Sequence, residues 1–468
     1  MTRTAKKGAA KSARSRSRAS KARAGAKKGA AKKKKLEDKL SMKRTLSWES
    51  LDGRKIQQIM KFSEGYKDFL DECKTERETI SYMVRELKAK GFKNIATFKG
   101  KKLKAGMKFY ELNRDKNLVV IVLGKKPLEQ GVNIVASHVD TPRLDLKQNP
   151  LYEDGETQMA LLKTHYYGGI KKYQWVNIPL ALHGRIIRND GKIIDITIGE
   201  EPGDPIFIIP DLLPHLARKR QGPRKLMEGI KGEELNILIG SLPIKDKGTK
   251  KKVKLWVLDY LNKKYGIVEE DFISAEMEAV PAGKAMDIGF DKSLIGAYGQ
   301  DDRICAYTSF RAILDIKTPE YTSIAFMVDK EEIGSDGPTS IRSRFIVDAI
   351  GNVLELTNNN YRESLLRSVL TNSRALSADV NAGINPLFKD VHEKMNAAKI
   401  GYGPVVTKFT GSGGKYLAND ASAEFTGAIR RMLNANKIPW QTAELGKVDE
   451  GGGGTVAKHM AVHNMDVI

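Results

Sequence analysis

The apolar residues of the first globular segment recur at helical spacing. Ile80, Met83, Val84 and Leu87 stand at positions i, i+3, i+4 and i+7, which predicts an amphipathic helix ending near Gly91. Further along, short runs of apolar residues bounded by polar ones predict buried strands over 118–123, 133–136 and 324–328. A second helix is expected over 304–316. Strands alternating with helices in this way favour an α/β fold with a buried sheet.

The middle of the chain has a different pattern. Residues 150–285 contain β-like runs at 193–198 and 205–209, a lysine-rich stretch around 245–254 and few clustered acids. We therefore expect a β-rich domain to be inserted here. The catalytic domain would then be discontinuous and consist of residues 46–149 and 286–468.

The first 45 residues form a tract of Ala, Lys, Arg, Ser and Gly that is expected to be disordered, because it has too little apolar surface to offset the entropy of ordering. The chain has a net charge of +23, and fifteen Lys or Arg residues but no acid precede residue 36. Three interpretations of this tail remain open. It is a solvated segment without a specific role, a binder of nucleic acid or another polyanion, or a targeting segment.

The composition excludes several classes of protein. Cys73 and Cys305 are the only cysteines and neither belongs to a CxxC pair, which excludes zinc-finger and thiol-redox sites and argues against a disulfide framework. The absence of a long apolar run and of a secretory signal predicts a cytoplasmic protein without a membrane partner. The glycine-rich segments 411–414 and 451–454 have neither a phosphate-loop nor a dinucleotide-binding spacing.

Acidic residues and one histidine follow, or lie near, the predicted strands. Four spots stand out: His138 with Asp140, Asp301 with Asp302, Glu331 with Glu332, and Asp379. Each spot alone has an ordinary explanation, such as a solvated turn or a helix cap. Together they are the ligand types that zinc takes in catalytic sites, where a base for the attacking water is also needed. Their grouping near strand ends predicts a carboxylate-rich metal site.

The same spots lie in longer motifs. These are ASHVDTP at 136–142, GQDDR at 299–303, DKEEIGS at 329–335 and SAD at 377–379, with further agreement in YGGI at 167–170, LHGR at 182–185, IPDL at 209–212 and GPV at 403–405. In order and rough spacing the series resembles the aspartyl aminopeptidase/aminopeptidase I family of di-zinc metallopeptidases. The resemblance covers about residues 50–468. It implies an α/β zinc aminopeptidase fold, in which a mixed central sheet is flanked by helices and the insert serves dimerisation and assembly.

The resemblance also implies two zinc ions per chain, with Co²⁺ or Mn²⁺ as alternatives. Six residues would share the site: His138 and Asp379 at the first zinc, Glu332 at the second, Asp301 between the two, Asp140 behind the His138 imidazole, and Glu331 as the general base. The implied activity is the removal of acidic or neutral N-terminal residues from peptides. The implied assembly is a homo-oligomer built from dimers, up to a dodecamer.

Two further residues are candidates for substrate binding. In such an assembly His215 would reach a neighbouring subunit's active site, and Lys408 would meet a substrate carboxylate. The ordinary alternatives are a locally packed histidine and a solvated lysine.

One departure from the family pattern concerns the second zinc. The family ends with a second-zinc histidine, whereas this sequence stops at Ile468, and His459 and His463 stand too early to replace it. We expect either a truncated sequence or a second zinc site that lacks a ligand and is weakly occupied. Two alternatives to a peptidase therefore stay open. One is a catalytically impaired scaffold with a polyanion-binding tail, and the other is a di-metal hydrolase of a non-peptide amide.

Overall fold

The computed structural model describes residues 36–98, 103–358 and 361–468. Most of the basic segment, residues 1–35, lies outside the described residues, so its predicted disorder and polyanion binding stay predictions. Residues 36–45 are described and are largely exposed. Arg44 attaches this segment to the rest of the chain, because its Nη2 donates to Thr442 Oγ1 at 3.2 Å.

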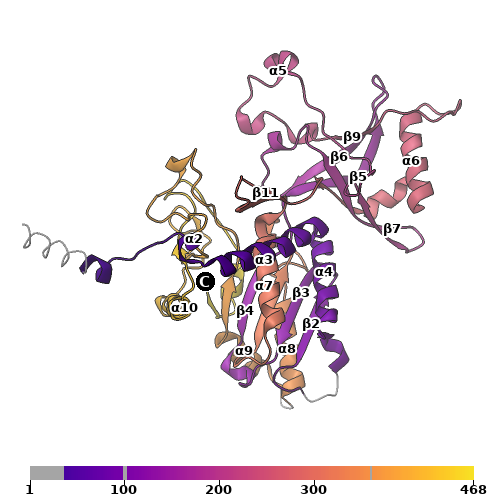
Figure 1. The fold of residues 1–468 in the computed structure, drawn as a ribbon. Coiled ribbons are helices and arrows are strands. Elements are labelled where there is room, and N and C mark those ends of the chain that lie inside the picture. The colour runs from indigo at the N-terminus through magenta and orange to yellow at the C-terminus, as the bar shows by residue number, and fades with distance from the viewer. Residues whose placement is uncertain (1–35, 99–102, 359–360) are drawn as a thin grey trace, which may run out of the picture.

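A seven-stranded mixed sheet forms the centre of the larger unit (Figure 1). The pairs β2–β3 and β3–β13 are antiparallel, whereas β13, β4, β14 and β19 run parallel to one another. In spatial order the strands are β1 (Lys93–Asn94), β2 (Lys108–Asn113), β3 (Asn117–Val122), β13 (Ser323–Val328), β4 (Asn133–His138), β14 (Arg374–Ser377) and β19 (Asp466–Val467).

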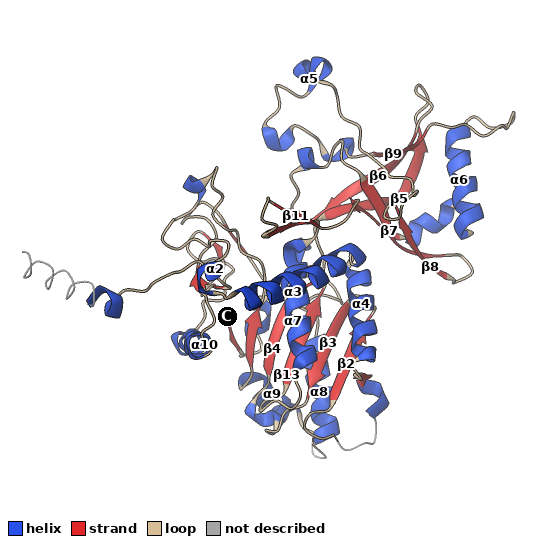
Figure 2. Ribbon diagram, in the orientation of Figure 1, coloured by secondary structure: helices blue, strands red, loops and turns tan. Residues whose placement is uncertain are grey.

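Helices cover both faces of this sheet (Figure 2). Alternate residues of β3 point to opposite faces, so Val120 packs with α3, α4 and α7, while Val119 packs with α8, α9 and α11. The helices are α3 (Gly53–Glu72), α4 (Glu76–Ala89), α7 (Gln300–Asp315), α8 (Phe345–Thr357), α9 (Glu363–Thr371) and α11 (Ala457–Ala461). This confirms the predicted α/β class with a mixed central sheet flanked by helices.

The local sequence explains where α4 begins. Thr75 accepts a hydrogen bond from the Glu78 backbone at 3.2 Å, and the Glu78 side chain accepts one from the Thr75 backbone at 2.9 Å. This capping box satisfies free backbone donors at the helix start. The predicted apolar positions Ile80, Met83 and Leu87 are buried beneath the sheet.

The other predicted elements of the central sheet also form. The runs 118–123, 133–136 and 324–328 correspond to β3, β4 and β13, and the helix expected over 304–316 is the body of α7. A small peripheral region carries the remaining short elements of this unit. They are α2 (Ser47–Ser50), α10 (Ala423–Ala435), β15 (Val405–Val406), β16 (Gly411–Ser412), β17 (Gln441–Thr442) and β18 (Gly452–Gly453).

A second, six-stranded sheet is built from the middle of the chain and is antiparallel throughout. Its strands, in spatial order, are β8 (Ile193–Ile198), β7 (Leu180–Ile187), β10 (Glu276–Pro281), β5 (Arg143–Glu153), β6 (Ala160–Tyr167) and β9 (Ile237–Gly240). Helices α5 (Pro214–Arg220) and α6 (Lys252–Tyr265) accompany it, and the hairpin β11 (Met286–Ile288)–β12 (Leu294–Gly296) leads back to α7.

One predicted run of this region does not become a strand. Residues 193–198 form β8, but within 205–209 only Phe207 and Ile208 pair, each in an isolated bridge, to Leu180 and Leu238. The core of this unit lies between the sheet and α6. None of the helices in the described ranges combines the length and apolar character of a membrane span.

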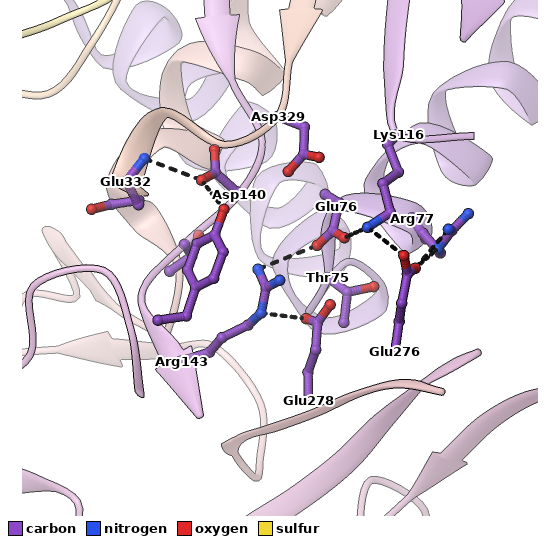
Figure 3. A network of polar contacts seen from close by, with 12 residues as sticks. Thr75, Glu76, Arg77, Lys116, Asp140, Arg143, Glu276, Glu278, Asp329 and Glu332 are labelled. Atoms are coloured by element: carbon purple, nitrogen blue, oxygen red, sulfur yellow. Dashed lines mark hydrogen bonds and ion pairs between the residues drawn. The ribbon is translucent and has the colours of Figure 1, made fainter. Parts of the chain in front are cut away.

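A buried ionic network joins the two sheets (Figure 3). Arg143 Nη1 lies 3.3 Å from Glu76 Oε2, and its Nε lies 3.2 Å from Glu278 Oε2. Lys116 Nζ lies 3.0 Å from Glu76 Oε1 and 3.1 Å from Glu276 Oε1. Burial alone would raise the pKa of Glu76, but Arg143 and Lys116 hold it well below its usual range. Burial raises the pKa of Glu278 despite the same arginine. The network therefore fixes the second sheet against the start of α4.

Candidate metal centre

The predicted site residues gather at the carboxyl edge of the parallel strands. His138 ends β4, and Asp379 follows the end of β14. Glu331 and Glu332 open the short helix η7 (Glu331–Ile333), just after β13. Asp301 lies in the first turn of α7. Because parallel strands end at the same edge of a sheet, residues far apart in the sequence share one site.

The imidazole of His138 is buried and its two nitrogens face different partners. Nδ1 lies 3.0 Å from the Asp140 carbonyl oxygen and 3.3 Å from Asp140 Oδ1. Nε2 lies 3.2 Å from Asp301 Oδ1 and 3.8 Å from Asp379 Oδ1. Asp140 therefore engages Nδ1 and leaves Nε2 directed at the two other carboxylates, an arrangement typical of a metal-binding histidine.

Asp140 is fully buried and organises more than the histidine. Its Oδ1 accepts from the Glu331 backbone N–H at 3.1 Å, and its Oδ2 accepts from the Glu332 backbone N–H at 3.1 Å. The Tyr167 hydroxyl donates to Oδ2 at 2.9 Å. Burial alone would raise the pKa of Asp140, but His138, Tyr167 and the backbone donor hold it below its ordinary value. One carboxylate thus fixes both the imidazole and the backbone of the two glutamates.

The two glutamates have raised pKa values. Burial, together with the negative charges of Asp379 and Asp140, raises the pKa of Glu331 to about 7, against the opposing effect of His138. Burial and the neighbouring Asp301 raise the pKa of Glu332 to about 8. The crowding of carboxylates around one imidazole thus disfavours additional negative charge, which suits a site that binds a cation.

The side chains available to a metal form two overlapping groups in the described part of the chain. One is His138, Asp301 and Glu332, and the other is His138, Asp302 and Asp379, with the ligand atoms of each group within 4.8 Å of one another. An imidazole nitrogen facing several carboxylate oxygens is a donor set that zinc takes, so these residues fit the metal. Thr455 supports the second group from behind, because its Oγ1 donates to Asp379 Oδ2 at 2.9 Å.

Two predicted substrate-binding residues lie outside this cluster within one chain. His215 is exposed on α5, a helix of the second unit (Figure 1). Lys408 is half-exposed and its Nζ lies 3.1 Å from Asp420 Oδ1. A single chain does not test whether His215 contacts a neighbouring subunit. The substrate-binding roles of His215 and Lys408 therefore stay predictions. His459 lies on α11 and His463 follows that helix, and neither belongs to the two ligand groups found among the described residues.

Three residues of the site carried little sequence signal. In the sequence Asp302 stands out only as a neighbour of Asp301, yet it belongs to a ligand group and burial raises its pKa well above the ordinary value. Tyr167 opens the YGGI segment at 167–170, but that segment does not indicate a contact with Asp140, and Thr455 looks like an ordinary loop residue in the sequence. Their role comes from pairing across the fold, which no local pattern reports.

A cavity of about 880 Å³ adjoins the centre. Asp379 and Cys305 line it near the ligands, and its remaining walls come mainly from residues 404–415, α10 and residues 444–457. Such a concave space beside a metal-type cluster is the natural place for a substrate side chain.

Comparison with known proteins agrees with this geometry. A family model described as "Aminopeptidase I zinc metalloprotease (M18)" matches residues 69–468. A probable M18 family aminopeptidase 1 from Clostridium acetobutylicum is 49% identical over 424 residues, which are 90% of each chain. Its counterpart from Borreliella afzelii is 50% identical over 429 residues, covering 91% of this chain and 93% of that one.

Solved structures extend the comparison. The crystal structure of an M18 aminopeptidase from Thermotoga maritima has a TM-score of 0.86 and 46% identity, covering 92% of both chains. A dodecamer of the yeast protein mApe1 shares the fold at 22% identity, with a TM-score of 0.68, covering 87% of this chain and 89% of that one. On the family model and the bacterial relatives, the chain belongs to the aminopeptidase I zinc metalloprotease family, M18, and is a metalloaminopeptidase.

Proposed function

We propose that this aminopeptidase removes neutral, apolar N-terminal residues from peptides, with Glu331 as the general base. The observation that carries the proposal is the arrangement around His138 and Asp140. His138 Nε2 faces Asp301 and Asp379, while the Asp140 carboxylate binds the backbone beneath Glu331 and Glu332. A cytoplasmic location, expected from the sequence, is part of the same proposal.

Four residues would hold the metal: His138 and Asp379 at a first zinc, Glu332 at a second, and Asp301 between them. Bound zinc would supply an acidified water and a polarised peptide carbonyl. Glu331 accepts a proton from the attacking water and returns it to the leaving amine. Asp140 keeps Nε2 of His138 and both glutamates in their orientation, so little reorganisation accompanies the reaction.

The two metal positions are expected to differ in affinity. The ligand groups of the described residues contain one imidazole, that of His138, and otherwise only carboxylates. We expect zinc to be held tightly where His138 contributes and weakly at the position of Glu332. After dialysis against a mild chelator, elemental analysis should find about one zinc per chain, and Co²⁺ or Mn²⁺ should refill the weaker position. Two zinc ions retained per chain after this treatment would contradict the expectation.

The cavity lining favours an apolar substrate side chain. Its apolar wall includes Val405, Val406, Phe409, Ile429, Met432 and Leu433. The lysines that line it are already paired, since Lys415 lies 3.0 Å from Asp420 and Lys447 lies 3.6 Å from Glu450. A buried substrate carboxylate would therefore lack a free cation there and would pay a desolvation cost.

Hydrolysis of leucyl-, aspartyl- and glutamyl-anilides tests this preference. We expect kcat/KM for the leucyl substrate to exceed the other two by about tenfold or more. A faster aspartyl or glutamyl substrate would overturn the apolar preference while leaving the peptidase assignment intact. Inactivity on all three with zinc, cobalt or manganese would instead favour the scaffold with a polyanion-binding tail, or a hydrolase of a non-peptide amide.

We also propose that the chain acts as a homo-oligomer. The yeast protein that shares its fold is a dodecamer. The insert, residues 150–285, would then mediate dimerisation and assembly. Leu213, just before helix α5, and Leu216 within it are exposed beside His215, which suits contact with a second subunit.

A further inference from the structure

Tyr167 connects the second sheet to the metal centre of the first. It is the last residue of β6 and is 8% exposed. Its hydroxyl donates to Asp140 Oδ2 at 2.9 Å, the same oxygen that accepts the Glu332 backbone N–H. Through this single carboxylate, a residue of the second sheet reaches the backbone of the glutamates and the imidazole of His138.

Arg143 holds the ring of Tyr167 in place. The two residues face each other in the β5–β6 pairing, and the guanidinium carbon lies 3.9 Å from the ring centroid. Arg143 is itself fixed between Glu76 of α4 and Glu278 of β10, at 3.3 and 3.2 Å (Figure 3). Helix α4 and the second sheet together therefore determine where the tyrosine hydroxyl lies.

We propose that Tyr167 is a positioning residue of the metal centre, and that it acts by holding the Asp140 carboxylate in the orientation that fixes His138, Glu331 and Glu332. The inference rests on the proposed assignment of His138 and Glu332 to zinc. Without the hydroxyl, Asp140 Oδ2 keeps only the backbone donor of Glu332, and the carboxylate is held less rigidly. The ligands are then less well ordered before a metal binds, which lowers affinity and slows the reaction.

The variant Tyr167→Phe tests this directly, because it removes the hydroxyl and keeps the ring against Arg143. Zinc Kd, measured by competition with a chromogenic chelator, should rise about 10–100-fold. The visible absorption of the cobalt-substituted protein should change, because it reports ligand geometry. With a leucyl anilide, kcat should fall more than KM changes. The matched control is Tyr166→Phe on the same strand, whose side chain is 43% exposed and which should leave all three readouts unchanged.

The possible results separate the inference from the function on which it rests. A wild-type chain that binds no zinc overturns both. A wild type that binds zinc, with a Tyr167→Phe variant of equal affinity and unchanged cobalt spectrum, overturns the inference alone.

Thermal unfolding of the zinc-free protein distinguishes a positioning role of the Tyr167 hydroxyl from a purely structural one. If the apoprotein of the variant no longer folds, or loses as much stability as the zinc form, the hydroxyl serves folding and the inference is wrong. An unchanged apoprotein with a smaller zinc-induced rise in Tm supports it.

Discussion

Replacing Glu331 with Gln is expected to lower kcat by about 10²–10⁴-fold while zinc stays bound. The amide of Gln has nearly the same shape as the carboxylate but cannot accept a proton from the attacking water. The backbone N–H of residue 331 still donates to Asp140, so the surrounding geometry is preserved. Glu331 also belongs to neither ligand group of the described residues. Rates on a leucyl anilide, together with zinc content by elemental analysis, give the two readouts.

A suitable control for this variant is Glu355→Gln, which makes the same chemical change at an exposed position of α8. It should keep wild-type kinetics. If Glu331→Gln retained more than roughly a tenth of the wild-type kcat, Glu331 would not be the general base. If the variant instead lost its zinc, Glu331 would be a ligand, and the assignments of the two adjacent glutamates would have to be exchanged.

Replacing Arg143 with Met should lower the free energy of unfolding by about 3–5 kcal/mol, because it leaves the buried Glu278 without its cation and Glu76 with Lys116 alone. Glu76 is 1% exposed and Glu278 is 4% exposed, so neither is readily solvated. Methionine keeps much of the aliphatic volume of the arginine, which limits the effect to the charge and its hydrogen bonds. Urea unfolding followed by both tryptophan fluorescence and circular dichroism measures the loss, and coincident curves would indicate a single transition.

Two comparison variants sharpen this test. Arg85→Met breaks an ion pair with Glu72 in which the side chains are 54% and 48% exposed, and it should cost only about 0–1 kcal/mol. The double variant Arg143→Met, Glu278→Gln should recover part of the loss, because the carboxyl group left without a cation is removed together with its partner. An Arg143→Met variant no less stable than Arg85→Met would show that the network between the sheets contributes little.

The elements predicted from the sequence are those whose signal is local. Continuous apolar runs predicted β3 and β13, because helices bury both faces of these two strands. The spacing of Ile80, Met83 and Leu87 predicted α4, because one side of that helix packs against the sheet. The candidate metal ligands could be predicted from the sequence, because acidic residues rarely cluster at the ends of apolar strands unless they have a function there.

Features that depend on pairing between distant segments were not predictable in this way. Residues 205–209 are apolar, but only Phe207 and Ile208 pair with other strands, each through an isolated bridge. Arg143 has no unusual local pattern, and the YGGI segment does not reveal what Tyr167 contacts. Their importance arises because β5 and β6 place them together beside Asp140. Asp302 likewise joins the ligand group only through the conformation of the first turn of α7.

The route of the chain between the sheets has a consequence for how this protein tolerates sequence change. The second sheet begins at Arg143, soon after Asp140, and the chain returns from it to α7 shortly before Asp301. Substitutions and insertions at outer turns of this unit, such as the β7–β8 turn, do not touch the ligands. Changes near the start of β5 or the end of β6 alter their orientation directly. Mutational drift and protein engineering therefore have wide freedom at outer turns such as that between β7 and β8, and very little at the start of β5 and the end of β6.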